Sequence, residues 1–371
     1  MNVPLLDLVA QYQSIKDAVI PAMMAVIERQ GFIMGPEVGQ LENDIAALCQ
    51  ARHGIACASG TDALLLPLKA LDLAPGDEII APAFTFFATA GAIHNAGGTP
   101  VFVDIDPDTF NVSPAAIEMA ITPRTRGIVV VHLFGQMAAM EEILPIAKRH
   151  NLAVIEDGAQ AIGARRQMDG GWKAACGLGT VGTLSFFPSK NLGAWGDGGM
   201  MITQDDAIAT RLRKLRLHGG AREYHHDEVG TNSRLDTLQA AVLKAKLPFL
   251  ARWSEGRRNR AARYTAAFSG HADVTPPHTD PLNEHIFHQY TIQAPDRDTL
   301  GTHLKNQGIG SKVYYPVPLH LQPCFAHLGY KRGSLPNTEV AMDRVISLPI
   351  FPELTDQQQD SVIAAVKGFY A

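Results

Sequence analysis

The sequence is short of cysteine and of long apolar runs. Its 371 residues contain four cysteines, and none of them has the C-x-x-C spacing of a metal or redox motif: Cys49, Cys57, Cys176 and Cys324. We therefore expect reduced thiols in a cytoplasmic protein, and no metal site. No apolar run approaches the length of a membrane span, and no secretory segment is recognisable at the start. We predict no membrane partner.

A large charge imbalance and a dinucleotide-binding fingerprint are also missing. The net charge of -5 provides no basic surface for nucleic acid, so we predict no nucleic-acid partner. No Gly-x-Gly-x-x-Gly motif follows an early strand, which argues against a nucleotide-dependent oxidoreductase. The 46% of hydrophobic residues are enough for a sizeable core and for more than one domain.

Apolar runs typical of buried strands alternate with helical stretches over the first two-thirds of the chain. The strand-like runs are residues 78–81, 99–104, 127–132, 152–155 and 183–187. Between them, residues 63–71 and 140–149 have the apolar spacing of helices. This alternation predicts an α/β fold with a mainly parallel sheet flanked by helices.

The pattern changes after residue 250. A long charged helical stretch at 252–267 leads to mixed strands and helices at 289–293, 300–305 and 356–366. We predict a large α/β domain at 1–250, which carries the site described next, and a smaller C-terminal α+β domain at 251–371.

The most informative segment is S-F-F-P-S-K-N-L-G-A-W-G-D-G-G at 185–199, which places Lys190 between an aromatic run and a glycine-rich loop. Asp157 follows the run 152–155, at the carboxyl end of a predicted parallel strand, where ligands gather. The segment S-G-T-D at 59–62 precedes a helical stretch, and small donors at a helix start suit a phosphate. Pyridoxal phosphate needs an amine, a carboxylate for its pyridine nitrogen and phosphate donors. The combination predicts a site for this cofactor.

Each of these features alone has an ordinary explanation. A lone lysine near a loop is usually a solvated surface residue. An aspartate after a strand is often a helix cap, and the segment 59–62 could be a simple N-cap. Their combination and their order along the chain favour the cofactor site.

Ordered motifs along nearly the whole chain carry a family resemblance. Besides residues 185–199 they are I-M-G-P-E-V at 33–38, S-G-T-D-A-L at 59–64, P-A-F-T-F-F-A-T at 82–89, V-D-I-D at 103–106, E-D-G-A-Q at 156–160, G-T-N-S-R-L-D-T-L-Q-A-A at 230–241 and Y-P-V-P-L-H at 315–320. The set closely resembles the DegT/DnrJ/EryC1/StrS family of sugar aminotransferases. That resemblance implies a fold-type I pyridoxal phosphate enzyme that acts on nucleotide-linked keto sugars.

The resemblance also implies roles around the cofactor ring. Lys190 would form the Schiff base with the cofactor aldehyde and then act as general base and acid in the 1,3-proton shift. Asp157 would hold the pyridinium nitrogen, and Gln160 would lie near the ring and its phenolic oxygen. Phe86 would stack on the ring face, although the sequence pattern alone favours a strand-core aromatic there.

A phosphate site shared between subunits is implied as well. Gly60, Thr61 and Ser185 would hold the phosphate, and Asn232 would reach the phosphate of the cofactor in the neighbouring subunit. We therefore expect a homodimer with shared active sites.

Residues 222–236, together with 185–190, most resemble one subgroup of the family. That subgroup aminates UDP-2-acetamido-2-deoxy-3-oxo-glucuronate, with glutamate as amino donor, for bacterial surface polysaccharide such as O-antigen. Arg234, Tyr314 and His320 are the candidates for substrate contacts, since a guanidinium binds a carboxylate or phosphate at two points. Arg234 could instead form a subunit-interface salt bridge, and His320 could be a hydrogen-bonded structural histidine.

Two departures from the pattern leave other sugars open. Gly158 replaces the usual alanine, which should loosen the turn but keep the carboxylate. Tyr314 stands where the subgroup often has histidine, so a keto-6-deoxy sugar on TDP or UDP stays an alternative. A sugar dehydratase of the same fold would have histidine in place of Lys190. A non-catalytic regulatory homologue is disfavoured because Lys190, Asp157 and Ser185 are all retained.

Overall fold

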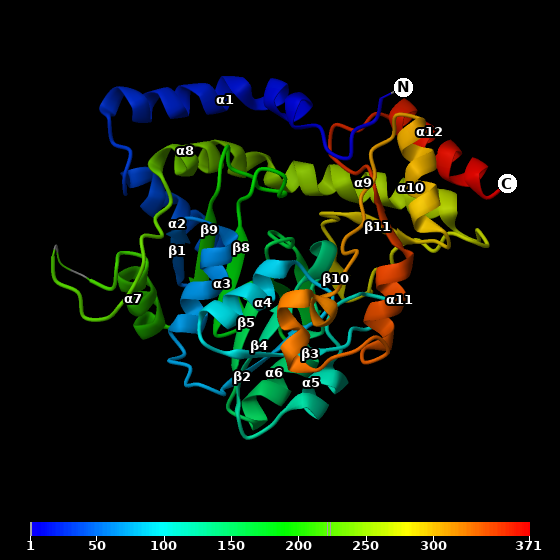
Figure 1. The fold of residues 1–371 in the computed structure, drawn as a ribbon. Coiled ribbons are helices and arrows are strands. Elements are labelled where there is room, and N and C mark those ends of the chain that lie inside the picture. Colours follow the sequence, from blue (N-terminus) through cyan, green and yellow to red (C-terminus); the bar gives the residue numbers. More distant parts are fainter. Residues whose placement is uncertain (1, 221, 223) are drawn as a thin grey trace.

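The computed structural model describes residues 2–220, 222 and 224–371, and its centre is a seven-stranded sheet (Figure 1). In order across the sheet the strands are β1 (His53–Cys57), β9 (Gly199–Thr203), β8 (Val181–Ser185), β5 (Ala153–Asp157), β4 (Thr125–Val131), β2 (Glu78–Pro82) and β3 (Thr99–Val103). Strand β9 is antiparallel to both neighbours, whereas β8, β5, β4, β2 and β3 run parallel. The predicted mainly parallel sheet is confirmed.

Helices cover both faces of this sheet. One face packs against α2 (Pro36–Leu48), α5 (Pro114–Ala120), α6 (Met140–Arg149) and α8 (Thr237–Lys246). The other packs against α3 (Gly60–Lys69), α4 (Phe87–Asn95) and α7 (Asp206–Leu215). Successive strand residues enter different cores, as Ile79 and Ile80 do. Because side chains alternate across a strand, both must be apolar, which explains the continuous apolar runs in the sequence.

The strand predicted at 183–187 ends two residues early. Strand β8 stops at Ser185, and the backbone of Phe186 bonds to loop residues instead, donating to the Gly198 carbonyl and accepting the Ala194 N–H, both at 2.8 Å. Pro188 follows and has no N–H to continue a ladder. The chain therefore leaves the sheet at its carboxyl edge, just before Lys190.

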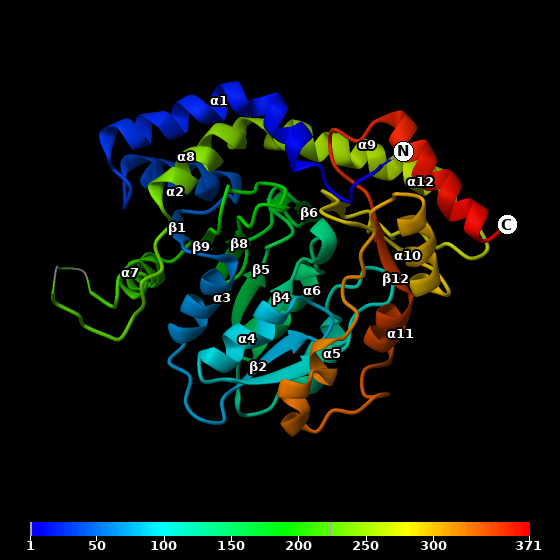
Figure 2. The same ribbon diagram turned by 45° about the horizontal axis from the view of Figure 1, so that its top comes forward.

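The C-terminal part of the chain has a core of its own. Helix α1 (Leu8–Arg29) lies beside α8 in both views, and α9 (Leu250–Phe268) leads away from them (Figures 1 and 2). Beyond α9 come the antiparallel pair β11 (Tyr290–Gln293) and β12 (Val345–Leu348), with α10 (Arg297–Asn306), α11 (Pro336–Arg344) and α12 (Asp356–Phe369). The described structure also has four short 3-10 helices: η1 (Leu133–Gly135), η2 (Leu247–Phe249), η3 (Leu319–Leu321) and η4 (Pro323–Leu328).

The boundary between residues 250 and 251 stays a prediction. It falls at the first residue of α9, and several contacts cross it. Val3 pairs with Ile309 and is buried in the C-terminal core. Strand β10 (Asn283–Glu284) pairs with β6 (Arg165–Met168), which continues into β7 (Gly171–Ala174). Met1, where the predicted large domain begins, lies outside the described residues.

Within the ranges that the structure describes, no helix is both long and apolar enough to cross a bilayer.

Candidate active site

Strand pairing brings three distant segments to one edge of the sheet. Asp157 ends β5 and Ser185 ends β8, the neighbouring strand. Across β8 and β9, Ser185 lies opposite Gly199, which in turn lies opposite Cys57 of β1. Since β1 runs into α3 through Ser59, the start of that helix lies beside the end of β8.

Gly60, Thr61 and Ser185 form a cradle at the start of α3. Ser59 caps the helix by accepting the Asp62 N–H on its Oγ at 3.1 Å. A Cβ atom on Gly60 would lie 2.6 Å from the Ser185 Cβ, so a side chain there would prevent the close approach. Among the described residues, none accepts a hydrogen bond from the N–H of Gly60 or Thr61. With the Ser185 hydroxyl, these groups are a donor set for a phosphate.

Asp157 is a buried carboxylate with few hydrogen bonds. Its side chain accepts the Thr89 hydroxyl at 3.0 Å and the Ala159 N–H at 3.2 Å. Burial raises its pKa above the ordinary value, and the two hydrogen bonds and the charge of Lys190 only oppose that shift. The unused lone pairs of such a carboxylate can accept the N–H of a protonated pyridine.

The Lys190 amine lies in the field of this carboxylate. Burial lowers its pKa to about 8, and attraction to Asp157 works in the opposite direction. An amine with such a pKa is neutral in roughly one molecule in ten at pH 7. Its Nζ donates no hydrogen bond to any residue that the structure describes. A nucleophilic amine is therefore available without a further base.

Gln160 and two aromatic residues border the same edge. The Gln160 side chain accepts the Phe134 N–H at 2.7 Å and donates to the Tyr315 hydroxyl at 2.9 Å. Phe86 is 58% exposed at the N-cap of α4, and its ring centroid lies 6.3 Å from that of Tyr315. The strand-core position that pattern alone favoured for Phe86 is wrong, because the chain has already left β2.

Directly behind Asp157, a second carboxylate is fully bonded. Glu156 is 0% exposed and accepts a hydrogen bond from His132 Nε2 at 2.9 Å. It also accepts three backbone N–H groups, from Cys176, Leu178 and Gly179. Because His132 Nδ1 accepts the Ala138 N–H, the ring proton is assigned to Nε2. Burial would raise the pKa of Glu156, but the bonds from His132 and the backbone lower it.

Sequence reasoning missed three of these residues: His132, Thr89 and Tyr315. His132 directly follows β4, at the edge where β5 and β8 end. His132 ends the run predicted as a strand at 127–132, and this place at the carboxyl end of a predicted parallel strand was a usable signal, similar to the one that identified Asp157. Thr89 and Tyr315 lie inside quoted motifs, but no local pattern marks either of them.

The segment proposed to reach a neighbouring subunit flanks the cradle. Ser233 is buried and donates to Asp62 at 2.7 Å. On either side of it, Asn232 is exposed and Arg234 is half-buried. Within the described residues, Arg234 has neither a hydrogen bond nor an ion pair, so its guanidinium is available. Glu223, in the segment 222–236, lies outside the described residues.

The side chains of Tyr314 and His320 differ in solvent exposure. Tyr314 is half-buried, burial raises its pKa, and the Lys312 Nζ lies 5.6 Å from its ring centroid. His320 is 1% exposed, and its Nε2 is bonded to Glu339 at 3.1 Å. This is the environment of the structural histidine considered above. No hydrogen bond joins His320 to Lys190 or Asp157 in the part of the chain that is described.

Position 158 has no room for a side chain. A Cβ atom there would lie 2.2 Å from the Cys176 Sγ. Its φ is not in the left-handed region, so the turn does not depend on glycine's freedom. The glycine in place of alanine is matched to a cysteine side chain packed against it.

These groups fit pyridoxal phosphate. The glycine-lined cradle suits its phosphate, the weakly bonded buried carboxylate suits its ring nitrogen, and the amine of lowered pKa suits its aldehyde.

The chain is similar in sequence to several known proteins. The pleiotropic regulatory protein of Geobacillus stearothermophilus is 53% identical, over 100% of this chain and 99% of that protein. UDP-N-acetyl-3-dehydro-alpha-D-glucosamine 3-aminotransferase of Acidithiobacillus ferrooxidans is 45% identical, over 98% and 97%. UDP-2-acetamido-2-deoxy-3-oxo-D-glucuronate aminotransferase of Pseudomonas aeruginosa is 41% identical, over 97% and 98%.

A solved structure and a family model agree with these similarities. The crystal structure of S. venezuelae DesV in complex with a ketimine intermediate superposes with a TM-score of 0.95 at 40% identity, over 99% of this chain and 98% of that one. The model of the DegT/DnrJ/EryC1/StrS aminotransferase family matches residues 13–367. Fold-type I architecture, pyridoxal phosphate and nucleotide-linked keto sugars are common to this family. The chain belongs to the DegT/DnrJ/EryC1/StrS family and is a pyridoxal phosphate-dependent nucleotide-sugar aminotransferase.

Proposed function

We propose that this enzyme transfers the amino group of glutamate to UDP-2-acetamido-2-deoxy-3-oxo-glucuronate, in the biosynthesis of bacterial surface polysaccharide. The observation that carries this choice is the available guanidinium of Arg234 beside the cradle. A uronic acid presents a carboxylate, which a planar guanidinium binds at two points. The 41% identity to the P. aeruginosa aminotransferase named for this sugar supports the same choice.

A second candidate is the corresponding 3-keto glucosamine. The A. ferrooxidans relative carries that sugar in its name and is 45% identical to this chain. The two sugars differ at carbon 6, which is a carboxylate in one and a hydroxymethyl group in the other. The experiment must therefore separate substrates by this one group.

The residues around the cofactor would divide the chemistry among them. When bound, pyridoxal phosphate supplies an aldehyde that takes up the amino group and a ring that accepts electrons. Lys190 would hold the aldehyde carbon and then carry the proton in the 1,3-shift, a task for which a pKa of about 8 suits it. Asp157 would hold the proton on the ring nitrogen, because its raised pKa makes it a better acceptor.

The remaining groups would orient the cofactor and the sugar. Gly60, Thr61 and Ser185 would bind the phosphate. Phe86 would cover the ring face, and Gln160 would direct its amide toward the phenolic oxygen. For the sugar, Arg234 and Tyr314 supply a cation and a hydroxyl. For His320, its pairing with Glu339 supports a structural role.

We also propose that two copies share their active sites. Asn232 is exposed beside the cradle of its own chain, as a residue that reaches a neighbour must be. Large apolar side chains near this edge are exposed and would be covered by a second copy: Ile33 52%, Phe86 58%, Phe87 46%, Phe187 52% and Val229 88%.

The visible spectrum of the purified protein with cofactor tests the proposed function. Glutamate should abolish the visible band, and the 3-keto uronic acid should restore it better than the 3-keto glucosamine or keto-6-deoxy sugars on UDP or TDP. A band that glutamate leaves unchanged would contradict the aminotransferase reaction.

Arg234→Met separates the two candidate sugars. It should lower kcat/KM for the uronic acid roughly 100-fold, and for the hydroxymethyl sugar much less, because only the first loses a charge-assisted contact. Equal losses for both would remove the argument for the uronate.

Mixed dimers test the shared site. A dimer of one Asn232→Ala subunit with one Lys190→Ala subunit should regain one of its two sites if Asn232 serves its neighbour. Absence of complementation would count against sharing.

A further inference from the structure

The segment that carries Lys190 is fastened to a distant part of the chain through Asn191. Asn191 is 5% exposed, its Nδ2 donates to the Ile286 carbonyl at 3.4 Å, and its Oδ1 lies 2.8 Å from Nδ1 of His288. With the amide oriented in this way, Oδ1 can only accept, so the His288 proton is assigned to Nδ1. The Lys190 segment is thus held by a histidine 97 residues away from Asn191.

The backbone of His288 is fixed in turn by a buried arginine. Arg257 of α9 is 4% exposed and donates to the carbonyls of Phe287, His288 and Ile350 at 3.1, 3.2 and 2.9 Å. A guanidinium is a rigid fork, so three bonds from it restrict the segment before β11 that carries His288. The result is a continuous path of hydrogen bonds from α9 through His288 to the residue after Lys190.

We propose that His288 is a positioning residue for Lys190, whose Nδ1–H holds Asn191 and so fixes where the neighbouring amine lies. This inference rests on the proposed role of Lys190. The chemistry requires the amine to meet the cofactor aldehyde in one geometry, and a small displacement of a reacting group is costly in rate.

A neutral histidine suits this place better than a charged donor. Asp157 faces the amine from β5, and Arg257 faces His288 from α9. Burial lowers the pKa of His288 well below its ordinary value, and the positive charges of Lys190 and Arg257 lower it further. His288 therefore orients Asn191 without adding a second positive charge beside the amine.

Two substitutions at position 288 isolate the Nδ1 donor. His288→Asn places an amide nitrogen where Nδ1 lies, whereas His288→Gln places one where Nε2 lies. If the Nδ1–H is what matters, asparagine preserves the function and glutamine does not. If His288 acted through packing alone, the asparagine variant would not be expected to retain more function than the glutamine variant.

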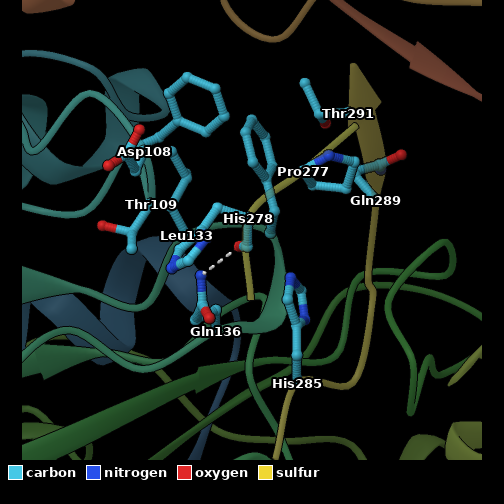
Figure 3. A pocket seen from close by; sticks show the side chains of 11 residues that line it. Asp108, Thr109, Leu133, Gln136, Pro277, His278, His285, Gln289 and Thr291 are labelled. Atoms are coloured by element: carbon cyan, nitrogen blue, oxygen red, sulfur yellow. Dashed lines mark hydrogen bonds between the residues drawn. The ribbon is translucent and has the colours of Figure 1, made fainter. Parts of the chain in front are cut away.

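His285 provides a matched control on the same segment. It is 4% exposed, its Nδ1 accepts the Phe287 N–H at 2.9 Å, and its ring stacks on Phe287. Figure 3 shows its ring turned toward a cavity of about 10 Å³, which Gln136 and His278 also border. Among the described residues no hydrogen bond joins the His285 side chain to Asn191, so His285→Gln should disturb packing and leave the bond between His288 and Asn191 in place.

The experiment measures the titration of the Lys190 amine in the 371-residue protein freed of cofactor. Acetylation of Lys190 by acetic anhydride is followed by peptide mass spectrometry from pH 6 to 10, with a thermal melt of each variant. The unaltered protein should be half-maximally labelled near pH 8. In His288→Gln the loosened segment admits water, so the pKa rises toward the ordinary lysine value of 10.5. The first unit of rise lowers labelling at pH 8 roughly fivefold, and each further unit roughly tenfold.

His288→Asn and His285→Gln should keep the original titration curve. A normal curve in His288→Gln, or equal shifts in the asparagine and glutamine variants, would overturn the proposal. If His288→Gln does not fold, Asn191→Ala removes the same bond from its other end and should give the same shift. If the double variant His288→Gln/Asn191→Ala folds, its Lys190 pKa should rise no more than in either single variant, because both substitutions remove the same bond. The labelling does not depend on turnover, so a failure of the proposed function would be recognised separately, by activity in Lys190→Ala.

Discussion

Glu156 and Asp157 are consecutive buried carboxylates whose pKa values move in opposite directions. They are 0% and 5% exposed, yet the pKa of Glu156 is lowered and that of Asp157 is raised. Burial acts in the same direction on both, because it disfavours the charged form of any carboxyl group. The difference must come from what each side chain is bonded to.

The two side chains point to opposite faces of β5. Glu156 meets His132 and three backbone N–H groups, which together satisfy it. Asp157 meets only Thr89 and the Ala159 N–H. Alternation along a strand therefore makes one residue a structural anchor and leaves the next with free lone pairs.

Two lysines, the half-buried Lys190 and the fully buried Lys246, repeat this contrast. Burial lowers the pKa of both Lys190 and Lys246 to about 8. The Lys246 Nζ donates to the Gly193 carbonyl at 2.5 Å and lies 5.9 Å from the Trp253 ring, whereas that of Lys190 has no hydrogen bond among the described residues. A perturbed pKa alone therefore does not identify the reactive group. The unused hydrogen-bonding capacity does.

The largest expected effect is on turnover, and it should distinguish Lys190 from Lys246. Lys190→Ala should lower turnover at least about 10⁴-fold, because both the covalent attachment and the proton carrier are lost. Lys246→Met should keep turnover within about tenfold, since it removes a bond to a loop carbonyl and no reacting group. Multiple-turnover assays of both purified variants make the comparison. Sustained turnover in Lys190→Ala would refute its role.

The next effect concerns Asp157. Asp157→Asn should lower the rate constant about 10³-fold but change cofactor occupancy much less, because an amide cannot hold the proton on the ring nitrogen. Rate and bound cofactor are measured on the same preparation. Thr89→Val is the control, since it removes one hydrogen bond to Asp157 and keeps the charge. An unchanged rate constant in Asp157→Asn would contradict the assignment.

For Glu156 the expected effect is on stability. Glu156→Gln should lower the free energy of unfolding by about 2–4 kcal/mol at pH 7, since His132 and three N–H groups lose a charged acceptor. The lowered pKa means that this stabilisation is complete above pH 4.5 and is lost as the pH falls through the folded-state value. The difference between variant and parent should therefore shrink on acidification.

Asp157→Asn should show the opposite dependence. Because the folded-state pKa of Asp157 is raised, its ionised form costs stability above that pKa, and the cost disappears as the pH falls toward 3.8. The asparagine variant should then equal or exceed the parent at pH 7 while losing activity. Urea unfolding of both variants between pH 4 and 7 tests the pair. Parallel curves for Glu156→Gln and Asp157→Asn would mean that the two carboxylates do not differ as described.

Much of the site could be predicted from the sequence because its elements follow a general rule. Parallel strands end at one edge, so Asp157 and Ser185 had to lie near each other once the strands were recognised. The bond between Thr89 and Asp157 joins residues 68 positions apart, and no local pattern records such a pair. Phe86 shows the limit of pattern alone, since an aromatic within an apolar run looks like strand core and is 58% exposed.

The smallest effect is expected at Gly158, directly after the two carboxylates. A methyl group there would meet the Cys176 Sγ at 2.2 Å, so Gly158→Ala should cost about 1–3 kcal/mol of stability. The Cys176 N–H donates a hydrogen bond to Glu156, so a displacement of Cys176 would disturb Glu156 directly. The turnover of the enzyme, which depends on Asp157 and Lys190, should change little. Gly158→Ala with Cys176→Ala should recover most of the loss, measured by urea unfolding beside the single variants. If the double variant is no more stable than Gly158→Ala alone, then the turn itself requires glycine and the spatial explanation is wrong.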